Sequence, residues 1–201
     1  MTSQDTGQFG YTGNILRANL TTGVALVENP TVDFYRQYLG GEGFVAYYLV
    51  KELEPMIDPL GDKNKLVFAT GVTTGAPLPG SSRSAVGGKS PLTGAFGEAD
   101  MGGFWGTELK RAGFDGVIVE GKAKEPIYLW IHDGEAEIRD ATGLWGKEIA
   151  ESQEMIRQDR GDKTIRVAQI GPAGENLVRY ACVISDLRYA AGRTGMGAVM
   201  G

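Results

Sequence analysis

The chain has 201 residues, of which 42% are hydrophobic and 22% charged, and its formal net charge is −5 at pH 7. A chain of this length and composition can bury one sizeable core, so a single domain is expected. The acidic balance argues against nucleic acid and anionic membranes as partners, because those surfaces select clustered Lys and Arg.

Cys182 is the only cysteine, so the chain cannot form an internal disulfide or complete a cysteine-ligated metal site. The first ten residues lack the basic start and apolar run of a targeting segment. No stretch approaches the roughly 20 apolar residues of a membrane span. A cytoplasmic protein is therefore expected.

The first elements along the chain read as a hairpin followed by helices. Residues 14–29 alternate apolar and polar side chains around a Thr22-Gly23 turn, which predicts a β-hairpin. Residues 32–39 and 43–55 follow as helices, the second because its apolar residues recur at helical spacing before Pro55. A strand over 64–75 then opens into a glycine turn.

The next segments alternate strands and glycine-rich loops. Residues 82–86 predict a strand that carries Arg83, and 97–106 predict a glycine-rich loop. A second hairpin, over 127–140, turns at Asp133-Gly134. The remaining predictions are a helix over 147–161, strands over 163–174 and 178–184, and a closing glycine-rich loop over 188–201.

The order of these elements suggests an internal duplication. Hairpin, helix, strand, glycine turn, Arg-strand and glycine loop follow one another twice, with Gly71 and Gly171 in equivalent positions. The predicted fold is therefore an α+β domain with approximate two-fold symmetry, two β-sheets and flanking helices. The alternative is that a suitable choice of windows makes an ordinary α+β chain look repetitive.

Several familiar motifs fail on inspection. The stretch 83–90 nearly matches a phosphate-binding P-loop but has Arg83 where the motif needs glycine. The closing glycines do not fit the dinucleotide fingerprint. His132 beside a turn is typical of an exposed residue, and Cys182 of a small buried one. Glu98 and Asp100 could form an acid/base pair, but such carboxylates more often form turns or face solvent.

The remaining signals point to an anion. Gly102-Gly103 precede a short helix that ends at Gly113, and the first amides of such a helix attract phosphate. Three arginines lie in or near the two glycine loops, and a guanidinium binds phosphate or a polar heterocycle through paired donors. They are Arg83, Arg188 and Arg193. Together these features favour a ligand that bears phosphate.

Seven strings in this order resemble one known family. They are "GYTGNILRANLTTG", "LGGEGFVAYYLVKE", "SRSAVGGKSPLTGAF", "MGGFWGTELKRAGFDGVIVEGKA", "AEIRDATGLWGK", "IGPAGENLVRYA" and "RYAAGRTGMGAVMG". The chain thereby resembles the N-terminal domain of the tungsten-containing aldehyde:ferredoxin oxidoreductases. The resemblance covers 10–201, and residues 1–9 are expected to be a disordered or tag-like N-terminus.

The resemblance implies a base for a bis-pterin tungsten, sometimes molybdenum, cofactor. Arg83 and Arg188 would contact the pterins, with Gly102 and Gly103 packed close to them and Arg193 nearby. A magnesium ion bridging the pterin phosphates would be held by main-chain carbonyls of Asp100 and Tyr189. Both positions depart from the family pattern, in which asparagine and a small residue are expected.

The resemblance also implies what lies elsewhere. The 4Fe-4S cluster and the acid/base residues of the family belong to later domains of a longer parent chain, so no catalytic residue is expected here. The parent would oxidise an aldehyde to a carboxylic acid and pass electrons to ferredoxin, and the fragment alone would be inactive. The family does not fix the aldehyde, the choice of tungsten or molybdenum, or the oligomeric state, and a homo-oligomer is one possibility.

Two other hypotheses stay open. One is a stand-alone module that binds a phosphorylated small molecule without redox chemistry, and the other is a structural subunit that has lost the cofactor. In the fragment, Phe104, Trp105 and Met196 are expected to be apolar loop residues without cover.

Overall fold

The computed structural model describes residues 10–201, so the predicted disordered N-terminus lies outside the described residues. Its helices are α1 (Val32–Tyr38), α2 (Glu42–Glu52), α3 (Trp105–Arg111), α4 (Ile149–Arg160), α5 (Pro172–Glu175) and α6 (Met196–Met200). Its strands are β1 (Ile15–Asn19), β2 (Val24–Glu28), β3 (Lys65–Thr70), β4 (Ser84–Lys89), β5 (Phe96–Met101), β6 (Gly116–Glu120), β7 (Ile127–His132), β8 (Glu135–Asp140), β9 (Ala168–Gln169), β10 (Val183–Ser185) and β11 (Tyr189–Ala191).

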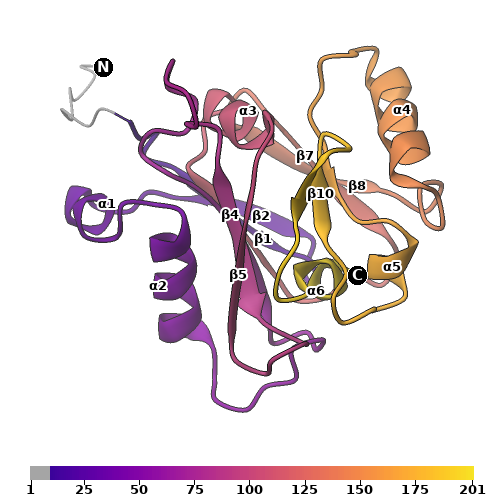
Figure 1. The fold of residues 1–201 in the computed structure, drawn as a ribbon, viewed down its shortest axis with the longest axis horizontal. Helices are drawn as coiled ribbons and strands as arrows, with labels where there is room; N and C mark the ends of the chain where they lie inside the picture. The colour runs from indigo at the N-terminus through magenta and orange to yellow at the C-terminus, as the bar shows by residue number, and fades with distance from the viewer. Residues whose placement is uncertain (1–9) are drawn as a thin grey trace.

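A six-stranded sheet forms the centre of the molecule, in the order β2-β1-β6-β3-β4-β5 (Figure 1). β1 and β6 pair in parallel, and the other neighbours pair antiparallel. The chain reaches this parallel pairing only after it has built α1, α2, β3, β4, β5 and α3, because parallel neighbours need a long crossover. The central sheet is therefore built from strands that lie far apart in the sequence.

Both faces of this sheet are covered, and successive residues of a strand face opposite cores. Leu16 of β1 belongs to one core and its neighbour Ile15 to the other. Phe68 and Val67 of β3 divide in the same way. Side chains alternate across a strand, so a strand that is apolar at every position must be buried on both sides.

Helices α1 and α2 cover one face through an aromatic cluster. Phe34 of α1 packs on Phe44 of α2 with ring centroids 4.8 Å apart. Helix α2 lies so close to β4 that a Cβ at Gly87 would stand 2.4 Å from Val45 Cγ1. Gly87 of β4 therefore allows this close packing.

The opposite face is covered by α3 and by the C-terminal third of the chain. Strands β11, β10 and β9 form a second sheet, and α6 packs beside α5 near the chain end (Figure 1). A Cβ at Gly197 would lie 2.6 Å from the Ala181 carbonyl carbon, and one at Gly201 would lie 2.1 Å from the Gly174 oxygen. The closing glycines thus let this layer pack on itself.

These contacts correct four predictions. The stretch 188–201 is a strand followed by α6 rather than a loop, and Met196 is fully buried because it packs against the sheet. Trp105 is half-buried against Phe68, with ring centroids 5.2 Å apart, whereas Phe104 is 53% exposed as expected. Most of the predicted loop 97–106 is strand β5 and the start of α3.

The structure has three sheets among its described residues, not two. Both predicted hairpins are confirmed, but β1 and β2 join the central sheet whereas β7 and β8 pair only with each other. The predicted strands over 163–174 and 178–184 shorten to β9 and β10. The α+β class is confirmed, and the internal duplication stays a prediction. Within 10–201, no helix is both long and apolar enough to cross a membrane.

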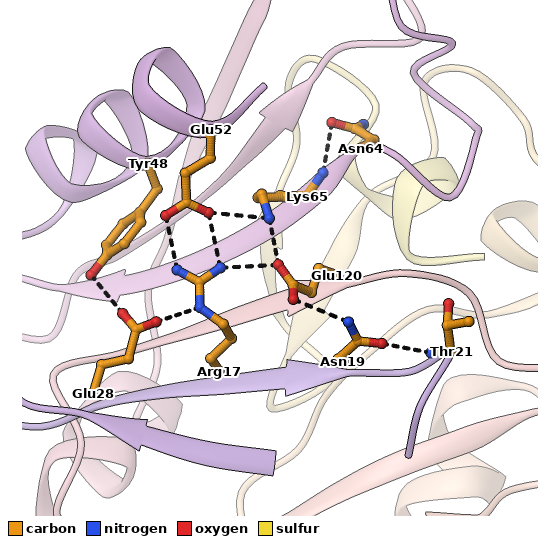
Figure 2. Close-up of polar contacts among 9 residues, drawn as sticks. All are labelled: Arg17, Asn19, Thr21, Glu28, Tyr48, Glu52, Asn64, Lys65 and Glu120. Carbon is orange, nitrogen blue, oxygen red and sulfur yellow. Dashed lines mark hydrogen bonds and ion pairs between the residues drawn. The ribbon is translucent and has the colours of Figure 1, made fainter. Parts of the chain in front are cut away.

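A cluster of charged side chains ties α2 to the sheet (Figure 2). Arg17 of β1 donates two hydrogen bonds of 2.9 Å to the carboxylate of Glu52, at the end of α2. It also pairs with Glu28 and Glu120, and Lys65 contacts Glu52 and Glu120. Burial raises the pKa of Glu52 and of Glu120, but the adjacent cations lower it by more. We name these five residues the Arg17 cluster.

Replacement of Arg17 by methionine is expected to destabilise the domain by about 3 kcal/mol or more, because Glu28 would lose its ion pair and Glu52 and Glu120 would keep only Lys65 as a cationic partner. Urea unfolding measures this change. Lys63→Met is the matched control, since the Lys63–Glu54 pair is 70% and 75% exposed, and such a pair contributes less than about 1 kcal/mol. Equal effects of the two variants would contradict a structural role for the cluster.

Edge strand β5 carries two carboxylates that face the start of α2. Glu98 and Asp100 lie two residues apart on one side of the strand, and Glu42 begins the helix. Burial, with added repulsion from Asp100 and Glu42, raises the pKa of Glu98 from 4.5 to about 7. The folded protein therefore binds a proton at Glu98 that the unfolded chain releases.

This raised pKa predicts that the Glu98→Gln substitution increases thermal stability relative to wild type by an amount that depends on pH. Glu98 contributes stability below its ordinary pKa of 4.5 and loses that contribution as pH rises to about 7. The melting temperature of Glu98→Gln should therefore rise relative to wild type between these two pH values and then stay level. Glu135→Gln, at an exposed position of β8, is the control that should show no such trend. A constant difference between Glu98→Gln and wild type would contradict the raised pKa.

Candidate functional site

A hollow of about 400 Å³ lies where the loop after β5 meets the β10–β11 hairpin. Two arginines from segments far apart in the sequence reach it. Its lining residues are Ser82, Arg83, Gly102, Gly103, Phe104, Arg188, Tyr189 and Ala190. We call it the arginine hollow.

The loop before β4 brings Arg83 to this hollow. The hydroxyl of Thr74 accepts a hydrogen bond from the Gly71 amide at 2.8 Å and donates one to the Arg83 carbonyl at 2.8 Å. The ammonium group of Lys110 donates to the Gly71 carbonyl at 2.6 Å and to the Val72 carbonyl at 3.1 Å. Burial lowers the pKa of this ammonium group. Both ends of the loop are therefore fixed by hydrogen bonds, and its last residue is Arg83.

A tight turn places Arg188 on the other wall. The Arg188 amide donates to the Ser185 carbonyl at 3.1 Å, which closes the turn between β10 and β11. The two central residues, Asp186 and Leu187, have φ angles of 50° and 61°. Arg188 therefore leaves the turn directly before β11.

Neither guanidinium is committed to another side chain. Within residues 10–201, Arg83 and Arg188 form no ion pair and donate no side-chain hydrogen bond, although both are exposed at the hollow. In an acidic protein with many carboxylates, arginines usually find such partners. Two uncommitted guanidinium groups beside one hollow form a site for an anion or for the edge of a polar heterocycle.

The side chain of Tyr189 covers the two glycines of this site. A Cβ at Gly102 would lie 3.0 Å from Tyr189 Cδ1, and one at Gly103 would lie 2.7 Å from Tyr189 Cδ2. Their lack of a side chain is thus explained within the chain, by the ring that packs on them. A ligand in the hollow meets the Tyr189 ring where the sequence suggested close contact with glycine backbone.

The amide that precedes α3 is also occupied. Phe104 N–H donates to Asp186 Oδ2 at 2.8 Å, so an internal carboxylate lies where the sequence suggested a bound phosphate. Helix α3 has only seven residues, and Phe104 is its N-cap. The two arginines are therefore the cationic groups that line the hollow.

The other predicted site residues lie apart from the arginine hollow. Asp100 lines a second hollow of about 170 Å³, which shares Arg83 with the first and also includes Gly41, Gly71 and Thr74. Arg193 lines neither hollow. The structure thus brings together Arg83, Gly102, Gly103, Arg188 and Tyr189, places Asp100 next to them, and leaves Arg193 outside.

Two lining residues and one supporting residue were not predicted from the sequence. The lining residues, Ser82 and Ala190, each adjoin a predicted residue, so their place follows once the loops are located. Asp186 carried a weaker signal, since aspartate tolerates the positive φ of a turn two residues before Arg188. Nothing in the sequence indicates that its carboxylate reaches Phe104.

The chain matches a known protein family and resembles several characterised proteins in sequence. Residues 15–201 match the family model described as "Aldehyde ferredoxin oxidoreductase, N-terminal domain". A tungsten-containing aldehyde ferredoxin oxidoreductase of Pyrococcus abyssi is 50% identical over 96% of this chain, and a second, of Pyrococcus furiosus, is 46% identical. This chain covers 32% of the length of each relative.

Proteins named for other activities also resemble this chain. The WOR-like subunit of an aliphatic sulfonate oxidoreductase from Pyrococcus furiosus is 38% identical over 96% of this chain. A solved structure, the active site complex BamBC of benzoyl coenzyme A reductase with 1,5-dienoyl-CoA, superposes with a TM-score of 0.93 at 40% identity. The match covers 96% of this chain and 29% of that one. With its match over 15–201, this chain belongs to the family of aldehyde ferredoxin oxidoreductase N-terminal domains.

Proposed function

We propose that this chain cradles one side of a tungsten or molybdenum bis-pterin cofactor within a longer oxidoreductase. The observation that carries the proposal is the convergence of Arg83 and Arg188, without partners among residues 10–201, on one hollow. Guanidinium groups suit both parts of such a group, because they bind phosphate with two parallel donors and stack or hydrogen-bond at heterocycle edges. The exposed rings of Phe104 and Tyr189 add apolar surface for a flat ligand.

For the whole protein we propose oxidation of an aldehyde to a carboxylic acid, with water as the oxygen source and ferredoxin as electron acceptor. Relatives that are 45–50% identical are named as tungsten-containing aldehyde ferredoxin oxidoreductases, which supports this reaction. Because the chain spans about a third of their length, the 4Fe-4S cluster and the acid/base residues are proposed to lie in the remaining domains. The bound metal would supply the two-electron redox chemistry.

The residues of this chain would then bind and orient, and none would be catalytic. Arg83 and Arg188 would contact the pterin groups, and the Tyr189 ring, which packs on Gly102 and Gly103, would line the same hollow. We further propose that main-chain carbonyls of Asp100 and Tyr189 would hold the magnesium ion that accompanies the cofactor. Within residues 10–201, no group of three or more His, Cys, Asp or Glu side chains is arranged to bind a metal.

Substrate choice is proposed to lie outside this domain. Relatives named for aldehyde, aliphatic sulfonate and benzoyl coenzyme A chemistry share this fold or sequence at 38–50% identity. A domain shared by proteins with such different substrates is suited to binding a component other than the substrate, and we propose that this component is the cofactor. We therefore expect residues 1–201 alone to show no aldehyde oxidation, and activity of this segment would overturn that division of roles.

The arginine assignment predicts the metal and pterin content of two matched variants. Arg188→Leu in the complete protein, purified anaerobically, should bind the cofactor at least about tenfold more weakly, because a charge-assisted contact contributes about 1.5–3 kcal/mol. Arg193→Leu should match wild type, since Arg193 lies outside both hollows. Elemental analysis for tungsten and molybdenum, with fluorescence of the oxidised pterins, measures both.

Three outcomes separate the hypotheses. Loss of metal and pterin in Arg188→Leu and in Arg83→Leu, but not in Arg193→Leu, supports the proposal, and full content in both Arg188→Leu and Arg83→Leu contradicts the role of the arginines. A wild-type protein from a metal-replete native host that holds neither metal nor pterin contradicts the oxidoreductase proposal. If that protein still binds inorganic pyrophosphate through Arg188, a phosphate-binding module without redox chemistry takes its place.

A further inference from the structure

The two walls of the arginine hollow belong to segments more than 80 residues apart, and one side chain joins them. Asp186 lies in the turn before Arg188, and its Oδ2 accepts a hydrogen bond of 2.8 Å from the Phe104 amide, 82 residues earlier in the chain. Its own amide donates to the Val167 carbonyl at 3.2 Å. Asp186 therefore contacts three parts of the chain: the β10–β11 turn, the loop after β5 and the segment before β9.

The surroundings of Asp186 are tightly packed. Its side chain is 8% exposed, and a Cβ at Gly103 would stand 2.8 Å from Oδ2. Its Oδ1 is buried without a hydrogen-bond partner and faces Arg166 Nη1 at 3.8 Å. The Arg166 guanidinium in turn lies 4.7 Å above the centre of the Phe104 ring. A buried carboxylate held by one amide and one nearby cation is rigid, because its desolvation is offset only in this geometry.

This geometry fixes the position of the Arg188 backbone. The turn that presents Arg188 has only two central residues, so its orientation follows that of Asp186. With Asp186 fixed to Phe104, the backbone of Arg188 keeps a constant position relative to Gly102 and Gly103. The packing of the Tyr189 ring on those glycines depends on the same relative position of the two segments.

We infer that Asp186 is a positioning residue for the arginine hollow: through its bond to the Phe104 amide it holds Arg188 and Tyr189 at the distance from the opposite wall that ligand binding needs. This inference rests on the proposed cofactor-binding function. Asp186 does not line the hollow, so it acts through its neighbours.

Two substitutions isolate the hydrogen bond from the turn. Asp186→Gly removes the carboxylate but keeps the positive φ of 50°, which glycine adopts freely. Asp186→Asn keeps an acceptor for the Phe104 amide and also tolerates this φ, while removing the charge. Asp133→Gly is the matched control: Asp133 has a φ of 45° in the β7–β8 turn, and its side chain is 95% exposed.

The experiment compares the complete, anaerobically purified protein with these three variants. The readouts are tungsten or molybdenum and pterin retained after prolonged gel filtration, and hydrogen exchange of the peptide that contains the Phe104 amide. Asp186→Gly should retain cofactor with about 10- to 100-fold lower affinity, in the range for residues that orient a metal site from outside it. Its Phe104 amide should exchange faster. Asp186→Asn should restore most of both properties, and Asp133→Gly should match wild type.

The outcomes keep the inference separate from the proposed function. Wild-type protein without metal or pterin contradicts the proposed function, and the exchange data then still test the link between Asp186 and Phe104. Loaded wild type together with a fully loaded Asp186→Gly variant overturns the inference. Failure of Asp186→Asn to restore binding, with Phe104 still protected, also overturns it, because the charge and not the alignment would then matter. An Asp186→Gly variant with an unchanged melting temperature but weaker cofactor retention would separate positioning from a loss of folding.

Discussion

The close approach of two layers to one sheet is the constraint on which this domain depends. The six-stranded sheet is buried on both sides, so helix α2 and the C-terminal layer must each come within side-chain contact of it. Gly97 shows how close this approach is, since a Cβ there would lie 2.9 Å from Met196 Cε and 2.9 Å from Ser90 Cβ. Because the C-terminal layer lies this near to β5, its hairpin brings Arg188 beside Gly102.

The Arg17 cluster has a second consequence, which concerns register. Lys65 of β3 pairs directly with Glu120 of β6 in the sheet, and Arg17 reaches Glu52 of α2 above them. A slip of one residue in a strand would turn these charges into an apolar core and lose their partners. Such a cluster contributes little to stability compared with a well-packed apolar core. Its value is that misaligned pairings of these strands cost much more free energy than the native one.

Much of the local structure was predictable, because it depends on neighbours in the sequence. Both hairpins follow from alternation around Thr22-Gly23 and Asp133-Gly134, and helices α2 and α4 follow from apolar spacing. The arginines were also predictable as a pair. The packing role of the glycines was not predictable. At Gly197, for example, the Ala181 backbone packs so closely that a side chain would not fit. Contacts of this kind join distant segments, and a single sequence does not record them.

The charges around the arginine hollow show why an internal carboxylate at the start of α3 does not weaken anion binding. Asp186 carries a negative charge next to Gly103, but Arg166 stands 3.8 Å from it and balances that charge. Arg83 and Arg188 therefore keep two positive charges for a ligand, one on each wall. Because Asp186 occupies the Phe104 amide, the proposed recognition of a ligand in this hollow would depend on the guanidinium groups of Arg83 and Arg188. A ligand with two anionic groups satisfies both walls at once, whereas a single small anion satisfies only one.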